Sequence, residues 1–242
     1  MYTRKPRGSH VVQKAYCIII YLHCIENCKS CLSGIAQPIN KVFATAAHSR
    51  YNTYKTDIER GFVMKKVLII SSSLRHNSNS ELIADEFAKG AVQSGHEVEK
   101  VSLKGKNIAF CKGCLSCIKT GSCFIKDDAI EITEKMKNAE VIAFATPVYY
   151  YSMSGQLKTL LDRANSLYGS DYKFKDIYLL ATAAENERSA AEGTIKGIQG
   201  WVDCFERAEL KGIVFGGGID DAGAAVNHQD VMKAAFELGK NI

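Results

Sequence analysis

The chain has 242 residues, of which 46% are hydrophobic and 24% charged, with nine cysteines and three prolines. This composition is typical of a globular protein and excludes a disordered, collagen-like or simple coiled-coil chain. The net charge of +5 is unevenly distributed, because residues 1–63 carry +6 and residues 64–242 carry −1. The larger part is nearly neutral and lacks the clustered basic residues of a nucleic-acid-binding surface, so we expect no nucleic-acid partner.

Residues 1–63 show no sustained hydrophobic period. We expect a basic, poorly ordered N-terminal extension there, followed by a folded domain over residues 64–242. A small cysteine-rich accessory segment is the alternative, because four of the nine cysteines lie in this part. The longest apolar run, Ala15–Leu22, is too short to span a membrane and resembles a secretory signal only faintly. We therefore expect no membrane association, and the cysteine spacing favours a reducing cytoplasm over a secreted disulfide framework.

Short apolar runs alternate with amphipathic stretches after Met64. The runs are rich in β-branched residues, as expected for strands buried on both faces. The predicted strands are Lys66–Ser71, His96–Leu103, Val141–Thr146, Ile177–Thr182 and Gly212–Phe215. The predicted helices are Ser80–Ser94, Ala129–Asn138 (with Asp127 or Asp128 as N-cap), Gly155–Leu167, Ala190–Glu206 and Asn227–Leu238. This alternation predicts an α/β fold in which an open five-stranded parallel sheet has helices on both faces.

The first predicted strand leads into a loop rich in Ser and Asn, which ends where a helix begins at Ser80. Unpaired backbone N–H groups and the helix dipole favour an anion at such a position. The side chain of Arg75 can pair with phosphate oxygens in forked geometry. Neither a dinucleotide-binding glycine pattern nor a Walker A pattern is present. The loop therefore predicts a phosphate site, with a polar turn capped by Ser78 or Asn79 as the alternative.

Two segments resemble one known family. Ser72-Ser73-Leu74-Arg75 followed by Asn79-Ser80 is similar to the Gly-Ser-x-Arg…Asn-Thr/Ser phosphate loop of the NADPH-dependent FMN reductases and iron–sulfur flavoproteins. Ser72 stands at the usual Gly and Leu74 at a frequent Pro. Residues 146–163 resemble the family's Thr-Pro-Val-Tyr…Gly-x-Leu-Lys…Asp-Arg stretch. The resemblance covers residues 64–242 and implies a flavodoxin-like fold with strand order 2-1-3-4-5.

The resemblance also implies the residues that bind FMN. Its phosphate would be held by Ser73, Arg75, Asn77, Ser78, Asn79 and Ser80. The flavin ring would lie beside Pro147, Val148, Tyr149, Tyr150, Ser152, Thr182 and Ala183. These positions follow central strands, where doubly wound folds bind ligands. Tyr151 is interpreted instead as a core and subunit-contact residue. For Lys158, Asp162 and Arg163 the alternative to a functional role is a surface ion-pair row along one helix.

Four cysteines form the pattern C-x2-C-x2-C-x5-C: Cys111, Cys114, Cys117 and Cys123. Four closely spaced thiolates can ligate a [4Fe–4S] cluster, and zinc accepts the same donors. The pattern matches the compact motif of iron–sulfur flavoproteins, in which the cluster lies near the FMN. Members of the wider group carry a similar segment and a following Asp-Asp, here Asp127-Asp128, without a cluster. Free thiols or a disulfide are therefore the alternative.

The resemblance implies an FMN-dependent oxidoreductase that takes electrons from NAD(P)H and passes them to a quinone or another small-molecule electron acceptor. An electron-transfer module with a ferredoxin-type partner is the main alternative, and a flavin-free scaffold is a weaker one. No catalytic side chain is expected, because the flavin carries the chemistry. Related flavoproteins commonly assemble, so we expect a homodimer or homotetramer.

Overall fold

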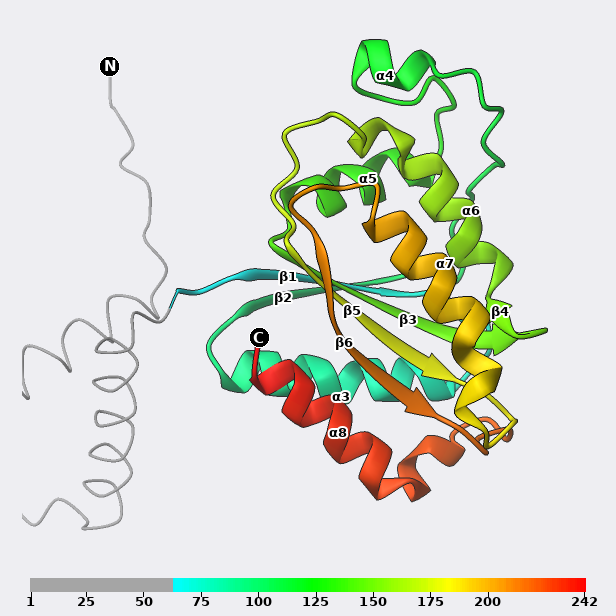
Figure 1. The fold of residues 1–242 in the computed structure, drawn as a ribbon. Helices are drawn as coiled ribbons and strands as arrows, with labels where there is room; N and C mark the ends of the chain where they lie inside the picture. Colours follow the sequence, from blue (N-terminus) through cyan, green and yellow to red (C-terminus); the bar gives the residue numbers. More distant parts are fainter. Residues whose placement is uncertain (1–62) are drawn as a thin grey trace, which may run out of the picture. The chain divides into compact units, whose positions relative to one another are not determined.

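A computed structural model of the chain describes residues 63–242 (Figure 1), so the expected extension over residues 1–63 falls almost wholly outside the described residues. The strands are β1 (Lys66–Ser71), β2 (Glu97–Ser102), β3 (Val141–Tyr149), β4 (Ser152–Met153), β5 (Asp176–Thr182) and β6 (Glu209–Gly216). The α-helices are α3 (Asn79–Gln93), α4 (Ser116–Thr120), α5 (Asp128–Asn138), α6 (Gly155–Arg163), α7 (Glu192–Val202) and α8 (Gln229–Lys240). Short 3₁₀ helices are η2 (Ala164–Leu167), η3 (Arg188–Ala191) and η4 (Ala224–Asn227).

The sheet has the order β2-β1-β3-β5-β6, and all of these neighbouring pairs are parallel. This is the predicted flavodoxin-like order, because β4 is a two-residue strand that pairs only with β3. The central strands carry apolar side chains on both faces, and five of the six residues of β1 are buried. The continuous apolar runs in the sequence therefore reflect burial between two layers of helices.

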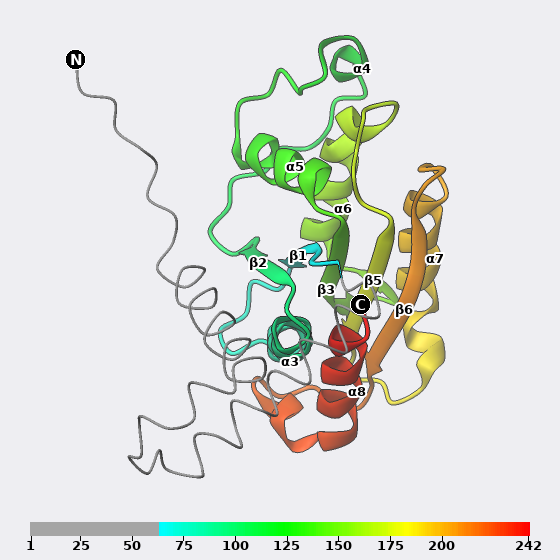
Figure 2. The same cartoon turned by 90° about the vertical axis from the view of Figure 1, so that its left-hand side faces the viewer.

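Helices cover both faces of the sheet (Figures 1 and 2). On one face α3 and α8 enclose a core cluster in which the ring centroids of Phe87 and Tyr178 are 5.4 Å apart. On the other face α5, α6 and α7 enclose a larger cluster, where Phe144 meets Trp201 edge-on at 5.6 Å. In this three-layer arrangement each amphipathic helix buries its apolar stripe against the sheet. Within residues 63–242, no helix combines the length and apolar character needed to cross a membrane.

Most element boundaries agree with the sequence predictions to within a few residues, and three differences matter for the site. Strand β3 continues to Tyr149, so the segment predicted as a loop begins as a strand that pairs with β4. The helix predicted over 155–167 is α-helical only to Arg163 and continues as 3₁₀ helix η2. Helix α4, five residues long, lies in the cysteine segment, where no helix was predicted.

Candidate functional site

The loop between β1 and α3 combines buried hydroxyls with an exposed tip. Ser73, Ser78 and Ser80 are buried, whereas the residues from Leu74 to Asn77 are exposed. Ser78 is the N-cap of α3, yet its side chain makes no capping hydrogen bond, and its Oγ lies 3.1 Å from Oγ of Ser80. The first turn of this 15-residue helix therefore presents N–H groups and a positive dipole end beside two hydroxyls. This arrangement fits a phosphate group.

The tip of the same loop has a left-handed residue and two backbone N–H groups without a partner among residues 63–242. Asn77 has a φ of 50°, in the left-handed region that asparagine tolerates. Its side chain lies against Gly223, where an added Cβ would be 2.1 Å from Asn77 Nδ2. Among residues 63–242, the backbone N–H groups of His76 and Asn77 have no hydrogen-bond partner. They are the kind of donors that bind anions in loops ahead of helices.

Arg75 and Asn79, two of the residues expected at the phosphate, have different environments. Arg75 is exposed, and its Nη1 donates to the backbone oxygen of Asp220 at 3.0 Å. The amide of Asn79 is engaged on both sides: Nδ2 donates to the backbone oxygens of Ile219 and Asp221, and Oδ1 accepts from the N–H of Ala225. Asn79 thus ties the loop to the segment after β6, while the guanidinium of Arg75 remains accessible at the surface.

A buried hydroxyl pair joins this loop to the segment after β3. Ser154 Oγ donates to Ser72 Oγ at 2.8 Å, and Ser72 Oγ in turn donates to the Ala145 oxygen at 3.2 Å. The N–H of Ser154 donates to Thr146 Oγ1 at 3.1 Å, and Ser154 also caps α6 by accepting from the N–H of Leu157. Ser154 was not among the predicted site residues, although a Ser directly before an amphipathic helix is a standard N-cap signal.

The tyrosines form a tight β-hairpin between β3 and β4. Tyr150 and Tyr151 have φ values of 48° and 61°, as the two central residues of a type I′ turn require. Left-handed backbone costs about 1–2 kcal/mol at a non-glycine residue, so the turn is held by its surroundings. Gly193 of α7 allows this approach, because an added Cβ would lie 2.2 Å from the Tyr151 oxygen. Tyr150 is fully exposed (100%) and Tyr151 is exposed too, so a core role for Tyr151 is wrong.

The segments after β5 and β6 pair with each other at the same edge of the sheet. The N–H of Ala183 donates to the Gly216 oxygen, and the N–H of Ile219 donates to the Ala183 oxygen, each at 2.9 Å. Thr182 lies opposite Pro147 in the sheet register. Parallel pairing brings the predicted positions after β1, β3 and β5 to one edge, where the arrowheads of Figure 1 end. The candidate ligand site is therefore assembled from loops far apart in the sequence.

The four cysteines of the motif line one cavity of about 450 Å³, together with Cys204 of the segment after α7. Cys117 is buried and its sulfur accepts from Asn165 Nδ2 at 3.4 Å, whereas Cys111 and Cys114 are exposed. Hydrogen bonds from the hydroxyl and N–H of Ser116 lower the pKa of Cys114. Nowhere in residues 63–242 do three Cys, His, Asp or Glu side chains converge as metal ligands. The donor chemistry fits a four-sulfur site, but the thiols do not meet at one point.

The cysteine cavity and the phosphate loop lie at opposite ends of α6. The helix begins next to Ser154 at the carboxyl edge of the sheet, and the cavity wall includes the last three residues of α6 and the first two of η2. Both views place α4 beyond α5, away from the arrowheads of β5 and β6 (Figures 1 and 2). Nine residues of α-helix span about 14 Å. Within one chain the two candidate sites are therefore separated by the length of this helix.

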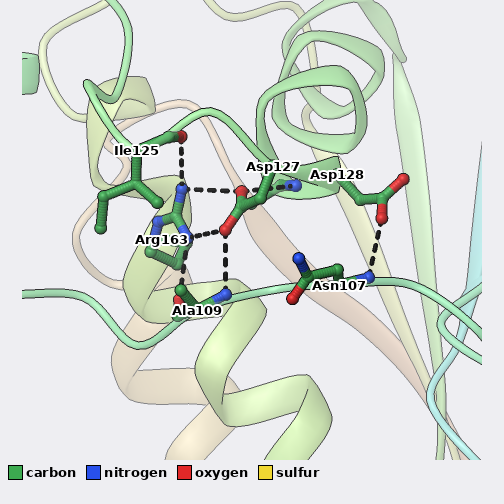
Figure 3. Close-up of polar contacts among 7 residues, drawn as sticks. Asn107, Ala109, Ile125, Asp127, Asp128 and Arg163 are labelled. Atoms are coloured by element: carbon green, nitrogen blue, oxygen red, sulfur yellow. Dashed lines mark hydrogen bonds and ion pairs between the residues drawn. The ribbon is translucent and has the colours of Figure 1, made fainter.

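Arg163 lies in the interior, so the alternative of a surface ion-pair row is wrong for this residue. Lys158 and Asp162 do form an exposed i,i+4 ion pair at 2.6 Å. The buried Arg163 side chain pairs instead with Asp127 (Figure 3). Asp127 is the N-cap of α5 and accepts from the N–H of Ala129, so the first of the two predicted caps is the one used. Burial opposes ionisation of Asp127, but hydrogen bonds from Arg163 and two backbone N–H groups outweigh it and lower its pKa.

The order of the parallel strands, with a Ser- and Asn-rich loop leading from β1 into helix α3, defines a flavodoxin-like α/β protein. The family described as NADPH-dependent FMN reductase matches residues 65–203. An iron–sulfur flavoprotein of Methanosarcina thermophila is 34% identical over 138 residues, which is 57% of this chain and 72% of that protein. The chain therefore belongs to the family of NADPH-dependent FMN reductases and iron–sulfur flavoproteins.

Further similarities cover different shares of the chain. An iron–sulfur flavoprotein of Methanocaldococcus jannaschii is 41% identical over 102 residues, 42% of this chain and 53% of that protein. The chain thus spans about half the length of several curated relatives that it matches. The solved NAD(P)H:quinone oxidoreductase from Methanothermobacter marburgensis has a TM-score of 0.58 at 18% identity, covering 74% of this chain and 97% of that one. At that identity the likeness supports the fold.

Proposed function

We propose that the chain binds FMN at the carboxyl edge of the sheet, takes electrons from NAD(P)H and passes them to a quinone or another small acceptor. The observation that carries the proposal is the β1–α3 loop, where unpaired N–H groups and buried hydroxyls surround the N-terminus of a long helix. FMN, when bound, supplies the hydride acceptor and the electron carrier. The family membership and the quinone-reducing structural neighbour support this assignment.

The residues of the chain would bind and orient the cofactor. The N–H groups of His76 and Asn77, the hydroxyls of Ser78 and Ser80, and the Arg75 guanidinium would hold the phosphate. The hairpin would support the flavin ring, because its strained turn is fixed by α7 and by strand pairing. A rigid turn places its backbone N–H groups without further ordering on binding.

The discrimination between FMN and riboflavin tests the phosphate site directly. Charge-assisted hydrogen bonds contribute about 1.5–3 kcal/mol each, so two of them predict at least about a 100-fold preference for FMN. The measurement is fluorescence titration of flavin-free protein with each flavin. Arg75→Ala should reduce the preference several-fold, whereas Arg188→Ala in η3 should leave it unchanged. Equal affinity of the unaltered protein for the two flavins would contradict a phosphate site in this loop.

A kinetic experiment tests the two proposed electron transfers, from NAD(P)H to the flavin and from the flavin to the acceptor. Stopped-flow mixing of the FMN-loaded protein with NADPH or NADH should bleach the flavin at rates of about 1 per second or faster, as expected for an enzyme. A quinone should then restore the flavin absorbance. Slow bleaching by both nucleotides, with rapid bleaching by a reduced ferredoxin, would instead favour the electron-transfer function.

That second function has its own support in the cysteine cavity. We propose that Cys111, Cys114, Cys117 and Cys123 hold a [4Fe–4S] cluster after residues 110–124 close around it, because all four line one cavity and relatives are named iron–sulfur flavoproteins. A ferredoxin-type partner would exchange electrons there. Iron and sulfide assays after anaerobic reconstitution test the cluster; less than one iron per chain leaves zinc or free thiols.

We also propose a homodimer or homotetramer. The support is the exposed aromatic hairpin, in which Tyr149, Tyr150 and Tyr151 all reach the surface beside the candidate flavin site. Contiguous exposed apolar groups commonly mark interfaces. Light scattering coupled to size-exclusion chromatography should give a mass of two or four chains, and Tyr150→Ser should shift it toward one.

A further inference from the structure

A buried charged pair joins the end of α6 to the cysteine segment. The Arg163 side chain is 0% exposed and that of Asp127 is 3% exposed. Nη1 donates to Oδ2 at 2.5 Å and Nη2 to Oδ1 at 2.9 Å, which is a forked, two-bond geometry (Figure 3). Burying two charges costs solvation free energy, and an apolar pair of similar size would not have this cost. The contribution of the pair to stability is therefore a weak explanation for its presence. The position of the pair indicates a second role, because Arg163 also bonds the backbone on both sides of the cysteine segment.

The pair connects the entry and the exit of the cysteine segment, residues 110–124. The same Nη1 donates to the backbone oxygen of Ala109 at 2.8 Å, and the same Nη2 donates to that of Ile125 at 3.1 Å. Asp127 Oδ2 accepts from the N–H of Ala109 at 2.9 Å. Both ends of the segment are therefore bound to each other and to the last residue of α6 (Figure 3).

One N–H of Arg163 remains unused. Its Nε is buried and has no hydrogen-bond partner within residues 63–242. Arg163 and Cys123 together line the 450 Å³ cavity and also an adjoining cavity of about 40 Å³. A buried donor without an acceptor is costly, and a ligated thiolate sulfur is a good acceptor.

We propose that Arg163 and Asp127 form a clasp that positions the four-cysteine segment, and that Arg163 Nε donates a hydrogen bond to the Cys123 sulfur when the cysteines hold a cluster. The second half of this inference rests on the proposed cluster function. Hydrogen bonds to cluster sulfurs raise the reduction potential. Ser154 at the start of α6 is bonded to Ser72 of the phosphate loop. The hydroxyl pair therefore fixes the first end of the helix that separates the two candidate sites, and the clasp fixes its last end.

Two conservative variants separate the parts of the clasp. Arg163→Lys keeps the positive charge and loses the forked donor, including Nε. Asp127→Asn removes the negative charge and keeps an oxygen that caps α5 through the Ala129 N–H. The matched control is Arg207→Lys: Arg207 also donates to a backbone oxygen, that of Tyr172 at 2.6 Å, but it does not line the cysteine cavity.

Three measurements on the full chain test the inference. Hydrogen–deuterium exchange of iron-free protein should be about tenfold faster for amides 107–127 in both variants, with β1 and β3 unchanged. Iron bound after anaerobic reconstitution should fall at least about threefold relative to Arg207→Lys, in line with the loss caused by altering groups around metal ligands. The cluster that remains in Arg163→Lys should have a lower midpoint potential, measured from its electron paramagnetic resonance signal.

The outcomes distinguish the two parts of the proposal, the clasp and the hydrogen bond to Cys123. Unchanged exchange over 107–127 in both variants would overturn the clasp, as would a general loosening that includes β1 and β3. Faster exchange with an unchanged potential would retain the clasp and refute the bond to Cys123. An unaltered protein that takes up no iron would refute the cluster function and with it the bond to Cys123, and the exchange measurement would still decide the clasp.

Discussion

Replacing Asn79 by Ala should destabilise the flavin-free protein, because its amide supports the loop structure and does not depend on a ligand. The buried side chain makes three hydrogen bonds, to the oxygens of Ile219 and Asp221 and from the N–H of Ala225. At about 1 kcal/mol each, their loss amounts to about 3 kcal/mol. For a domain of the size of residues 63–242, this corresponds to a fall in Tm of about 6–12 °C.

Thermal unfolding of flavin-free protein, followed by circular dichroism, measures this effect, and FMN titration of the same samples measures affinity. Arg75→Ala is the control, because the exposed Arg75 makes one hydrogen bond, to the Asp220 oxygen. It should weaken FMN binding and change the free energy of unfolding by less than about 0.5 kcal/mol. Unchanged stability in Asn79→Ala together with weakened FMN binding would refute this reasoning, since the amide would then act on the phosphate itself.

Three further predictions concern the cap of α6, the close approach of α7 to the tyrosine hairpin, and a histidine outside the candidate site. Ser154→Ala should lower the free energy of unfolding in urea by about 1–2 kcal/mol, because α6 loses its N-cap; a value near zero would mean that the cap is dispensable. Gly193→Ala, whose Cβ would lie 2.2 Å from the Tyr151 oxygen, should cost about 1–3 kcal/mol. Gly200→Ala in the same helix has no atom within 4 Å of its Cβ and should stabilise by about 0.5–1 kcal/mol; similar effects of the two would contradict the close approach. Burial lowers the pKa of His96 from 6.5, so the unfolded chain binds the proton more readily and stability should decrease as the pH falls below about 6.5. His96→Gln should remove that part of the dependence of Tm on pH.

The layered architecture could be predicted from local patterns. Each central strand is a short apolar run, and each helix has an apolar stripe, so the periodicities of the sequence indicate element type and the faces to be buried. The structure differs where pairing across a turn adds strand residues. Val148 and Tyr149 belong to β3 because they pair with Met153 and Ser152. The spacing of hydrophobic residues along the chain gives no information about such pairing.

The residue types at the candidate site could also be predicted from the sequence, but the contacts that each residue makes could not. The Ser- and Asn-rich loop, the tyrosine turn and the cysteine spacing are properties of contiguous segments, so the sequence alone determined which segments were predicted as an anion site and as a cysteine site. Tertiary structure decided which groups remain available to a ligand. The Asn79 amide is used by backbone 140 and more positions away, and Arg163 turns inward to Asp127, 36 positions before it. Hydrogen-bond partners at such separations depend on how strands and helices stack, because a buried polar group must pair with whatever the packing places beside it.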